Sequence, residues 1–313
     1  VPGVWARWDS GYYLTIAARG YSLHGKELSF FPVYPLAIRL MSGGYVPFFG
    51  WAAILVSNLA FVLAMMLLKK KVESDYGRDV AWATIITISV SPTSFFFSAM
   101  YSESLFLLLS VLVYLFSARE RYITAGLFVS LASVTRIYGI LLLIIPLMSI
   151  MIRKPARSRS KVVALGLLSV AGLVIYCSYL WISQGSPFTF VSTQEEFKRS
   201  ITFPGYLLLD SFRVMLWGHG GFQGNWFMRV LSIQDVLALL LFIGCAILGF
   251  RLLKGKDVAL YLLFAAVMLS VSHGPYTLGA YSMSRYVLTL FPGFIVIGIL
   301  LSRFPRLKWV IWA

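Results

Sequence analysis

The segment Trp51-Ala-Ala-Ile-Leu-Val-Ser-Asn-Leu-Ala-Phe-Val-Leu-Ala-Met-Met-Leu-Leu68 contains no charged residue and is followed at once by Lys69-Lys70-Lys71. A helix of this length is long enough to cross a bilayer hydrocarbon core of ~30 Å. A lysine cluster directly after such a helix is typical of its cytoplasmic end. The segment therefore predicts a membrane-spanning helix.

Apolar segments of similar character follow along the rest of the chain. Two shorter ones lie between Tyr122 and Ile152 and are interrupted at Thr135-Arg136, which predicts a helical hairpin that turns near the far interface. The sequence thus predicts an all-α, polytopic transmembrane protein with spans at Ala81–Ala99, Ser104–Ala118, Val162–Ile182, Val236–Leu253, Val258–Ser272 and Tyr286–Ser302.

The composition requires the bilayer as solvent. Of the 313 residues, 59% are hydrophobic and 12% charged, and the mean hydropathy is +0.82. Since the connections between apolar segments are short, residues 1–313 predict a single membrane-embedded domain. We expect a first transmembrane helix before residue 1 and further helices after residue 313. Residues 1–50 and 184–235 form the two long polar segments.

The basic residues predict the orientation of the chain. Short cytoplasmic loops of membrane proteins are enriched in Lys and Arg. The basic residues of a groove that binds nucleic acid would form one surface and would not be separated by apolar segments. The Lys and Arg clusters between the apolar segments all lie on one side of the membrane if the hairpin enters and leaves the membrane on the same side. The segments on the outer side of the membrane are then residues 1–50, 100–103, 184–235 and 273–285. No nucleic-acid partner is expected.

Asp9, in the segment Trp5-Ala-Arg-Trp-Asp9, is the first candidate for chemistry. It precedes a short amphipathic helix that begins near Tyr12, so it can be an N-cap. A carboxylate at the membrane surface among Trp8, Tyr12 and Tyr13 is also suited to act as a general base, because aromatic walls limit water and can stack on a sugar ring. From the residues alone, both roles stay open.

Four ordered motifs carry a resemblance to a known family. They are Trp8-Asp9 with Ile16-Ala17 and Gly20-Tyr21; Phe30-Phe31-Pro32-Val-Tyr-Pro35; Phe96-Phe-Ser-Ala-Met-Tyr101-Ser-Glu103-Ser; and Thr135-Arg136 with Gly139. In this order they resemble the PIG-V family of mannosyltransferases, whose eukaryotic members are GPI mannosyltransferase II.

The resemblance implies an inverting glycosyltransferase of GT-C type that uses a polyprenyl- or dolichyl-phosphate sugar. Its acceptor would be a lipid-linked glycan, or a cell-envelope glycan or glycolipid if the chain is prokaryotic. Asp9 then matches the catalytic carboxylate of the first outer loop. The active site would face outward from the plasma membrane of a prokaryote, or the lumen of the endoplasmic reticulum of a eukaryote.

A departing lipid phosphate must be stabilised by positively charged side chains, and we assign three arginines to this role. Arg136 lies at the hairpin turn, where an arginine in an apolar setting is costly; the alternative is an arginine that snorkels to the headgroups. Arg285, at the outward start of a late helix, could instead be an interfacial anchor. Arg7 could bind the phosphate or keep Asp9 ionised.

Contacts to the acceptor or the sugar are assigned to five side chains. Glu103 could orient the acceptor, pair with Arg136, or cap the helix that begins at Ser104. The other four are Trp8, Tyr12, Tyr101 and His219. No histidine pair has metal-ligand spacing, so we expect no metal or other cofactor; one Mg²⁺ held by Asp9 and Glu103 is the alternative.

Two other functions fit the composition. A transporter or flippase for a polyprenyl-linked sugar would need a similar aromatic cavity, but it predicts inverted repeats with broken helices in both halves. A non-catalytic membrane scaffold would make Asp9 only a cap. The motifs favour the enzyme over both.

Overall fold

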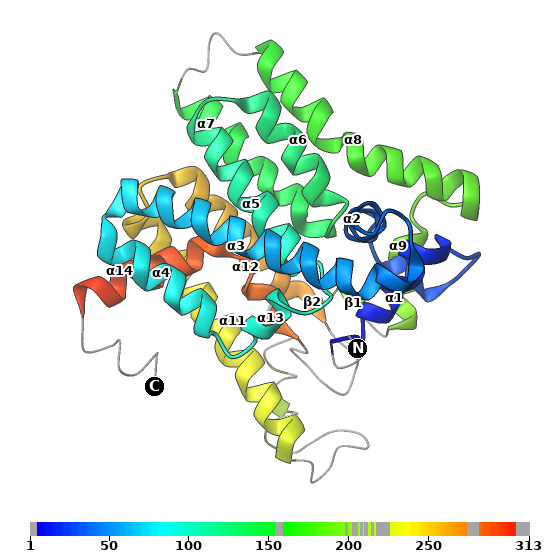
Figure 1. The fold of residues 1–313 in the computed structure, drawn as a ribbon. Coiled ribbons are helices and arrows are strands. Elements are labelled where there is room, and N and C mark those ends of the chain that lie inside the picture. Colours follow the sequence, from blue (N-terminus) through cyan, green and yellow to red (C-terminus); the bar gives the residue numbers. More distant parts are fainter. Residues whose placement is uncertain are drawn as a thin grey trace.

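The computed structural model describes residues 5–153, 159–197, 200–201, 226–273 and 282–304, with residues 206, 209, 212–213 and 216 between them. Nearly all of this part of the chain is helical, which confirms the all-α prediction (Figure 1). The elements are α1 (Ser10–Arg19), η1 (Lys26–Ser29), α2 (Val33–Met41), η2 (Val46–Phe48), α3 (Phe49–Tyr76), α4 (Arg78–Val90), η3 (Ser94–Phe97), α5 (Glu103–Ala118), α6 (Tyr122–Ser133), η4 (Ile137–Leu143), α7 (Ile144–Arg153), α8 (Arg159–Gln184), α9 (Thr189–Glu196), β1 (Ser200–Ile201), α11 (Trp226–Leu252), α12 (Lys256–Val271), β2 (Ser272–His273), α13 (Met283–Val287) and α14 (Phe291–Arg303). The two short strands pair antiparallel.

Three helices of the described chain are long and apolar enough to cross a membrane: Val46–Tyr76, Ser160–Gln184 and Val230–Leu252. The first contains the segment Trp51–Leu68. Large apolar side chains on these helices remain exposed, including Met66 and Ile182. Such surfaces are stable in hydrocarbon and not in water, so the protein is an all-α membrane protein.

Two predicted spans are shorter than expected, and proline explains both. The helix expected over Ala81–Ala99 ends at Val90, because Ser91 precedes Pro92 and adopts an extended ψ of 139°. The chain then turns through η3. The span expected over Tyr286–Ser302 is divided into α13 and α14, and Pro292 stands in the first turn of α14.

The hairpin is present as α6 followed by η4 and α7, with Arg136 in extended conformation at the turn.

The centre of the bundle is formed around the last described helix. Every residue from 285 to 299 is buried. Helix α14 packs against α4, where Gly298 lies against Val80 and Thr84, and α12 and α11 cover its other sides. Burial of this segment on all sides places α13, and with it Arg285, inside the protein.

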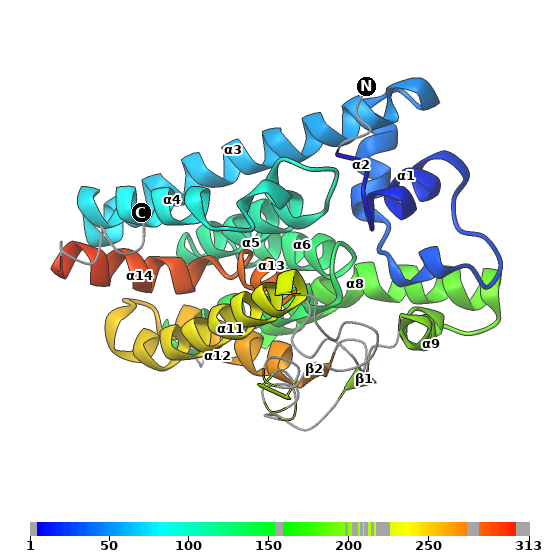
Figure 2. The same cartoon turned by 90° about the horizontal axis from the view of Figure 1, so that it is seen from below.

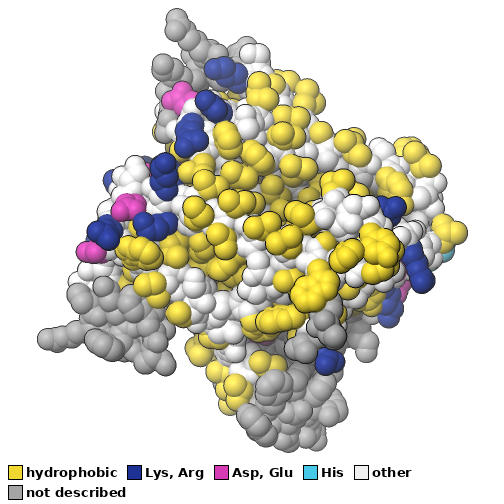
Figure 3. Space-filling view, in the orientation of Figure 1, with side chains coloured by type: hydrophobic (Ala, Val, Ile, Leu, Met, Phe, Trp, Pro, Cys, Tyr) yellow, Lys and Arg dark blue, Asp and Glu magenta, His cyan; other side chains and the backbone are white. Residues whose placement is uncertain are grey.

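The turns after α3, α5 and α11, which carry Lys and Arg and are called the basic turns below, lie together at one end of the bundle. At that end Tyr114 donates a hydrogen bond to Asp75 at 2.9 Å, and the backbone N–H of Lys254 donates to the hydroxyl of Tyr76 at 2.8 Å. Figure 3 shows basic side chains along the left edge, where these turns lie in Figure 1, next to a mostly apolar face. Helices α1, α2 and α9 lie at the other end, as Figure 2 also shows.

Candidate active site

Asp9 lies directly before α1, but its side chain does not cap the helix. Its backbone carbonyl accepts hydrogen bonds from the N–H groups of Tyr12 at 3.1 Å and Tyr13 at 3.3 Å, while the carboxylate makes no capping bond. The preceding residue, Trp8, has a left-handed φ of 48°, which a bulky side chain rarely adopts. The carboxylate of Asp9 is therefore not an N-cap and is available to another partner.

That partner is Arg285, which comes from α13 at the far end of the sequence. Its Nη1 donates to Oδ2 of Asp9 at 2.6 Å, in an ion pair whose side chains are 8% (Arg285) and 26% (Asp9) exposed. Burial opposes the charge of Arg285, but Glu103 and Asp9 hold its pKa well above the ordinary value. Arg285 is thus a buried, charged residue and not an interfacial anchor.

Glu103 connects Arg285 to Arg136. It is the first residue of α5 and is fully buried, and its Oε1 accepts from Arg136 Nη1 at 2.8 Å and from Nε of Arg285. Helix α5 has no side-chain cap, so Glu103 forms ion pairs in place of a capping bond. We call the resulting row of alternating charges the four-charge chain; its members are Asp9, Arg285, Glu103 and Arg136.

Aromatic rings enclose both guanidinium groups. Arg285 lies 4.4 Å from the ring centroid of Tyr101 and 4.8 Å from that of Phe96. Arg136 lies between Tyr138 and Tyr286, at 5.3 and 5.2 Å. These contacts keep the arginines out of water and strengthen the ion pairs. Arg136 therefore does not snorkel to the headgroups.

Asp235, on α11, is a site residue that the sequence interpretation did not single out. It is buried; its Oδ1 accepts from the N–H of Ser284 at 2.8 Å, and its Oδ2 from the N–H of Ser282 at 2.9 Å. Ser282 has a left-handed φ of 66° at the start of α13. Asp235 thereby fixes the short helix that carries Arg285. A lone acid within an apolar helix was the only signal that could have found it.

Gly139 fixes the turn that carries Arg136. Its N–H donates to the carbonyl of Arg136 at 2.8 Å, and a Cβ here would overlap the carbonyl group of Ala132 and lie 2.7 Å from the nitrogen of Ser133. Only glycine allows this approach of η4 to the end of α6.

Replacing Gly139 by Ala is expected to destabilise the protein by about 1–3 kcal/mol, because backbone atoms must shift to admit the methyl group. The control is Gly166→Ala on α8, where nothing lies within 4 Å of the new Cβ. Thermal unfolding of the purified proteins in detergent compares the two. Equal unfolding midpoints would contradict the role given to Gly139.

The remaining predicted site residues have different surroundings. Arg7 is exposed, and no described residue forms an ion pair with it; its backbone carbonyl accepts from the hydroxyl of Tyr101 at 2.7 Å. Trp8 is 71% exposed, and the ring of Tyr12 stacks on Phe30 with centroids 4.7 Å apart. His219 lies outside the described residues.

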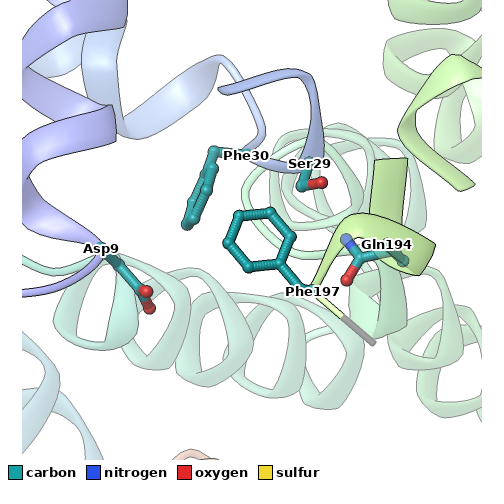
Figure 4. Close-up of a pocket in the computed structure, with 5 residues that line it drawn as sticks. All are labelled: Asp9, Ser29, Phe30, Gln194 and Phe197. Carbon is teal, nitrogen blue, oxygen red and sulfur yellow. The ribbon is translucent and has the colours of Figure 1, made fainter. Parts of the chain in front are cut away.

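A small pocket opens beside Asp9 (Figure 4). Its volume is about 40 Å³, and its lining residues are Asp9, Ser29, Phe30, Gln194 and Phe197. Figure 4 shows Asp9 and Gln194 on opposite sides, with the rings of Phe30 and Phe197 between them. Ser29, Gln194 and Phe197 were not predicted, because nothing local to α9 indicates that it approaches residue 9.

Within the described part of the chain, no three His, Cys, Asp or Glu side chains are grouped so that they could hold a metal ion. The two carboxylates considered for Mg²⁺, Asp9 and Glu103, both bind Arg285. A guanidinium thus provides the positive charge shared by these two carboxylates. Metal independence stays a prediction.

Comparison with known proteins gives a family match. Residues 3–184 match the family described as mannosyltransferase (PIG-V), a region that contains Asp9, Glu103 and Arg136 but ends before Arg285. GPI mannosyltransferase 2 of Yarrowia lipolytica is 32% identical over 135 residues, which cover 43% of this chain and 37% of the relative. GPI alpha-1,6-mannosyltransferase 2 of Mus musculus is 30% identical over 145 residues, 43% of this chain and 29% of the relative.

GPI mannosyltransferase 2 of Cryptococcus neoformans is 29% identical over 146 residues, which cover 43% of this chain and 34% of the relative. The chain therefore matches about a third of the length of these curated relatives. No solved structure matches the chain.

Proposed function

The chain belongs to the PIG-V mannosyltransferase family, and we propose that it moves a mannosyl residue from a polyprenyl- or dolichyl-phosphate carrier to a lipid-linked acceptor outside the cytoplasm. The relatives are named for mannosyl transfer to GPI. The observation that carries the proposal is the state of Asp9: one oxygen is held by Arg285, and the carboxylate borders a pocket.

Asp9 is the proposed general base. Arg285 binds Oδ2, and no described residue donates a hydrogen bond to Oδ1. The acceptor hydroxyl would give its proton to Asp9 while its oxygen forms a bond to the anomeric carbon of mannose. The bond from that carbon to the phosphate oxygen breaks, and the phosphate takes the electron pair. Attack opposite the leaving group inverts the anomeric centre.

The four-charge chain matches the charge changes of this reaction. With Asp9 ionised, its two carboxylates and two guanidinium groups sum to zero. Once Asp9 has taken the proton, the chain carries one positive charge, at the moment when negative charge collects on the departing phosphate. Fixed positive charge in a water-poor site stabilises such a transition state.

The three proposed phosphate-binding arginines would contribute in different ways. Arg136 and Arg285 are engaged by carboxylates, but each guanidinium carries five N–H donors, and their bonds to Glu103 and Asp9 use only some of them. Arg7 is exposed near Asp9 and forms no ion pair with a described residue. We assign the first contact with the lipid phosphate to Arg7 and stabilisation of the departing phosphate to Arg285.

The position of the site relative to the basic turns supports an extracytoplasmic reaction. Helix α5 begins at Glu103 in the site and ends beside Arg119, and its sixteen residues span ~24 Å at the rise of an α-helix. The proposed site therefore lies most of a hydrocarbon thickness away from the basic turns. Because basic turns favour the cytoplasm, the site would face the cell exterior or a lumen.

Transfer can be tested directly in membranes that contain the full-length protein. Polyprenyl-phosphate mannose labelled in the sugar is added, and the labelled product is identified after extraction. We expect label in a new glycolipid or glycan. Label that crosses the membrane while still attached to the polyprenyl phosphate would favour the transporter, and donor that stays unchanged on both sides would favour the scaffold.

A further inference from the structure

The pocket beside Asp9 has the chemistry of a sugar subsite. We infer that the α9 pocket, formed by Asp9, Ser29, Phe30, Gln194 and Phe197, binds the hydroxyl-bearing edge of a pyranose ring of the acceptor. This inference rests on the proposed function, since it takes Asp9 as the base. It places the bound acceptor beside η1 and α9.

The polar groups of the α9 pocket complement a sugar hydroxyl. Oδ1 of Asp9 has no donor among the described residues, and the amide of Gln194 has no hydrogen-bond partner there. A hydroxyl group donates one hydrogen bond and accepts others, so it can donate to Asp9, while a neighbouring hydroxyl exchanges hydrogen bonds with Gln194. Two adjacent hydroxyls of one ring satisfy both side chains.

Charge and size favour the acceptor over the donor. The lining holds one carboxylate and no cation, so none of the lining residues offers a positive charge to the phosphate of the donor. Its volume of about 40 Å³ is a few times the ~10–15 Å³ that a cavity needs to hold one water molecule, so it has room for a few water-sized groups. The α9 pocket therefore takes hydroxyl groups at one edge of a ring and excludes an isoprenoid chain.

The aromatic residues give the α9 pocket firm, apolar walls. One face of Phe30 is covered by the stacked ring of Tyr12, and the ring of Phe197 meets Phe30 edge to face at 6.0 Å and 85°. Aromatic walls accept the C–H groups of a pyranose and leave little room for competing water.

Helix α9 is held against η1, so its polar residue has a defined position. The hydroxyl of Ser29 donates to that of Thr193 at 2.9 Å, and Phe190 packs on Phe31 with ring centroids 5.5 Å apart. Gln194 and Phe197 are three residues apart and therefore share the face directed at Asp9. Residues of α9 can thus select among acceptors without altering the base.

The test compares Gln194→Ala with Glu195→Ala, whose side chain is exposed and does not line the α9 pocket. Loss of one hydrogen bond of about 1.4 kcal/mol is a factor of ten. We expect Gln194→Ala to raise the KM for the acceptor about tenfold, with the donor KM and kcat unchanged within about twofold. Gln194→Glu, which loses the amide donor, should raise the acceptor KM at least as much.

Binding of methyl α-mannoside to the full chain distinguishes this inference from the proposed function. It is measured, without donor, as the thermal stabilisation that the sugar gives. We expect the sugar to stabilise the wild type and the Glu195→Ala variant but not Gln194→Ala. An active Gln194→Ala enzyme with an unchanged acceptor KM overturns the subsite and leaves the transferase. Sugar binding that depends on Gln194 in a protein without transfer activity overturns the transferase and keeps the subsite.

Discussion

Replacing Asp9 by Asn is expected to lower kcat for mannosyl transfer by about 10²–10⁴-fold, the range that a positioned general base contributes. An amide oxygen can still accept the hydrogen bond from Arg285, so the fold and the position of α1 should be kept. What the variant lacks is a group that takes the acceptor proton. The effect should therefore appear in kcat, with the donor KM close to that of the wild type.

The measurement is a rate assay with labelled lipid-phosphate mannose at saturating acceptor, together with thermal unfolding of each variant. Glu196→Gln is the matched control, because it also neutralises a carboxylate near the site, but one that is exposed on α9 and outside the pocket. Its kcat should equal that of the wild type. An Asp9→Asn enzyme with full turnover would remove Asp9 from the mechanism.

Replacing Glu103 by Gln is expected to have the largest effect on stability. The side chain is fully buried and is the shared anion of Arg136 and Arg285, so its loss leaves buried positive charge with one carboxylate in place of two. Breaking a buried ion pair from one side costs about 3–5 kcal/mol. Activity should fall as well, since Arg285 also positions Asp9.

Glu73→Gln is the control for this change. Glu73 pairs with Lys69 at 2.8 Å on α3, but its side chain is 39% exposed. Such a surface pair contributes about 0–1 kcal/mol. Reversible unfolding in detergent should therefore separate the two variants by several kcal/mol. Equal stabilities would mean that water or lipid headgroups solvate the arginines and that the four-charge chain is not a closed unit.

The double variant Glu103→Gln with Arg136→Gln isolates the interaction. It removes one anion and one cation, which returns the remaining pair of Asp9 and Arg285 to neutrality. We expect it to be more stable than the sum of the two single losses predicts, with a coupling of about 0.5–3 kcal/mol. Strict additivity would contradict a direct ion pair between Glu103 and Arg136.

Local features of the molecule could be predicted from the sequence because they depend on nearby residues. The uncharged segment Trp51–Leu68 forms part of α3, and the break at Thr135-Arg136 is the turn between α6 and η4. Pro92 would also have indicated the early end of α4, because the residue before a proline leaves the helical region. That signal was present in the sequence but was outweighed by the apolar run around it.

The partners of the charged residues could not be predicted in this way. Asp9 at the start of α1 had two open roles, and only the position of Arg285, 276 residues later, showed that its side chain does not cap the helix. The links from Asp235 to Ser284 and the approach of Gln194 to Asp9 likewise join segments far apart along the chain.

By itself, the sequence determined that this is an all-α membrane protein of the PIG-V family and that Asp9, Glu103 and Arg136 belong to its family-matched region. Hydrophobic length and proline position act over a few turns of helix, so they can be recognised without a fold. The tertiary structure alone decided which cation faces which anion. A buried charge is stable only beside its partner, and the approach of α13 and of the start of α5 to the start of α1 brings those partners together.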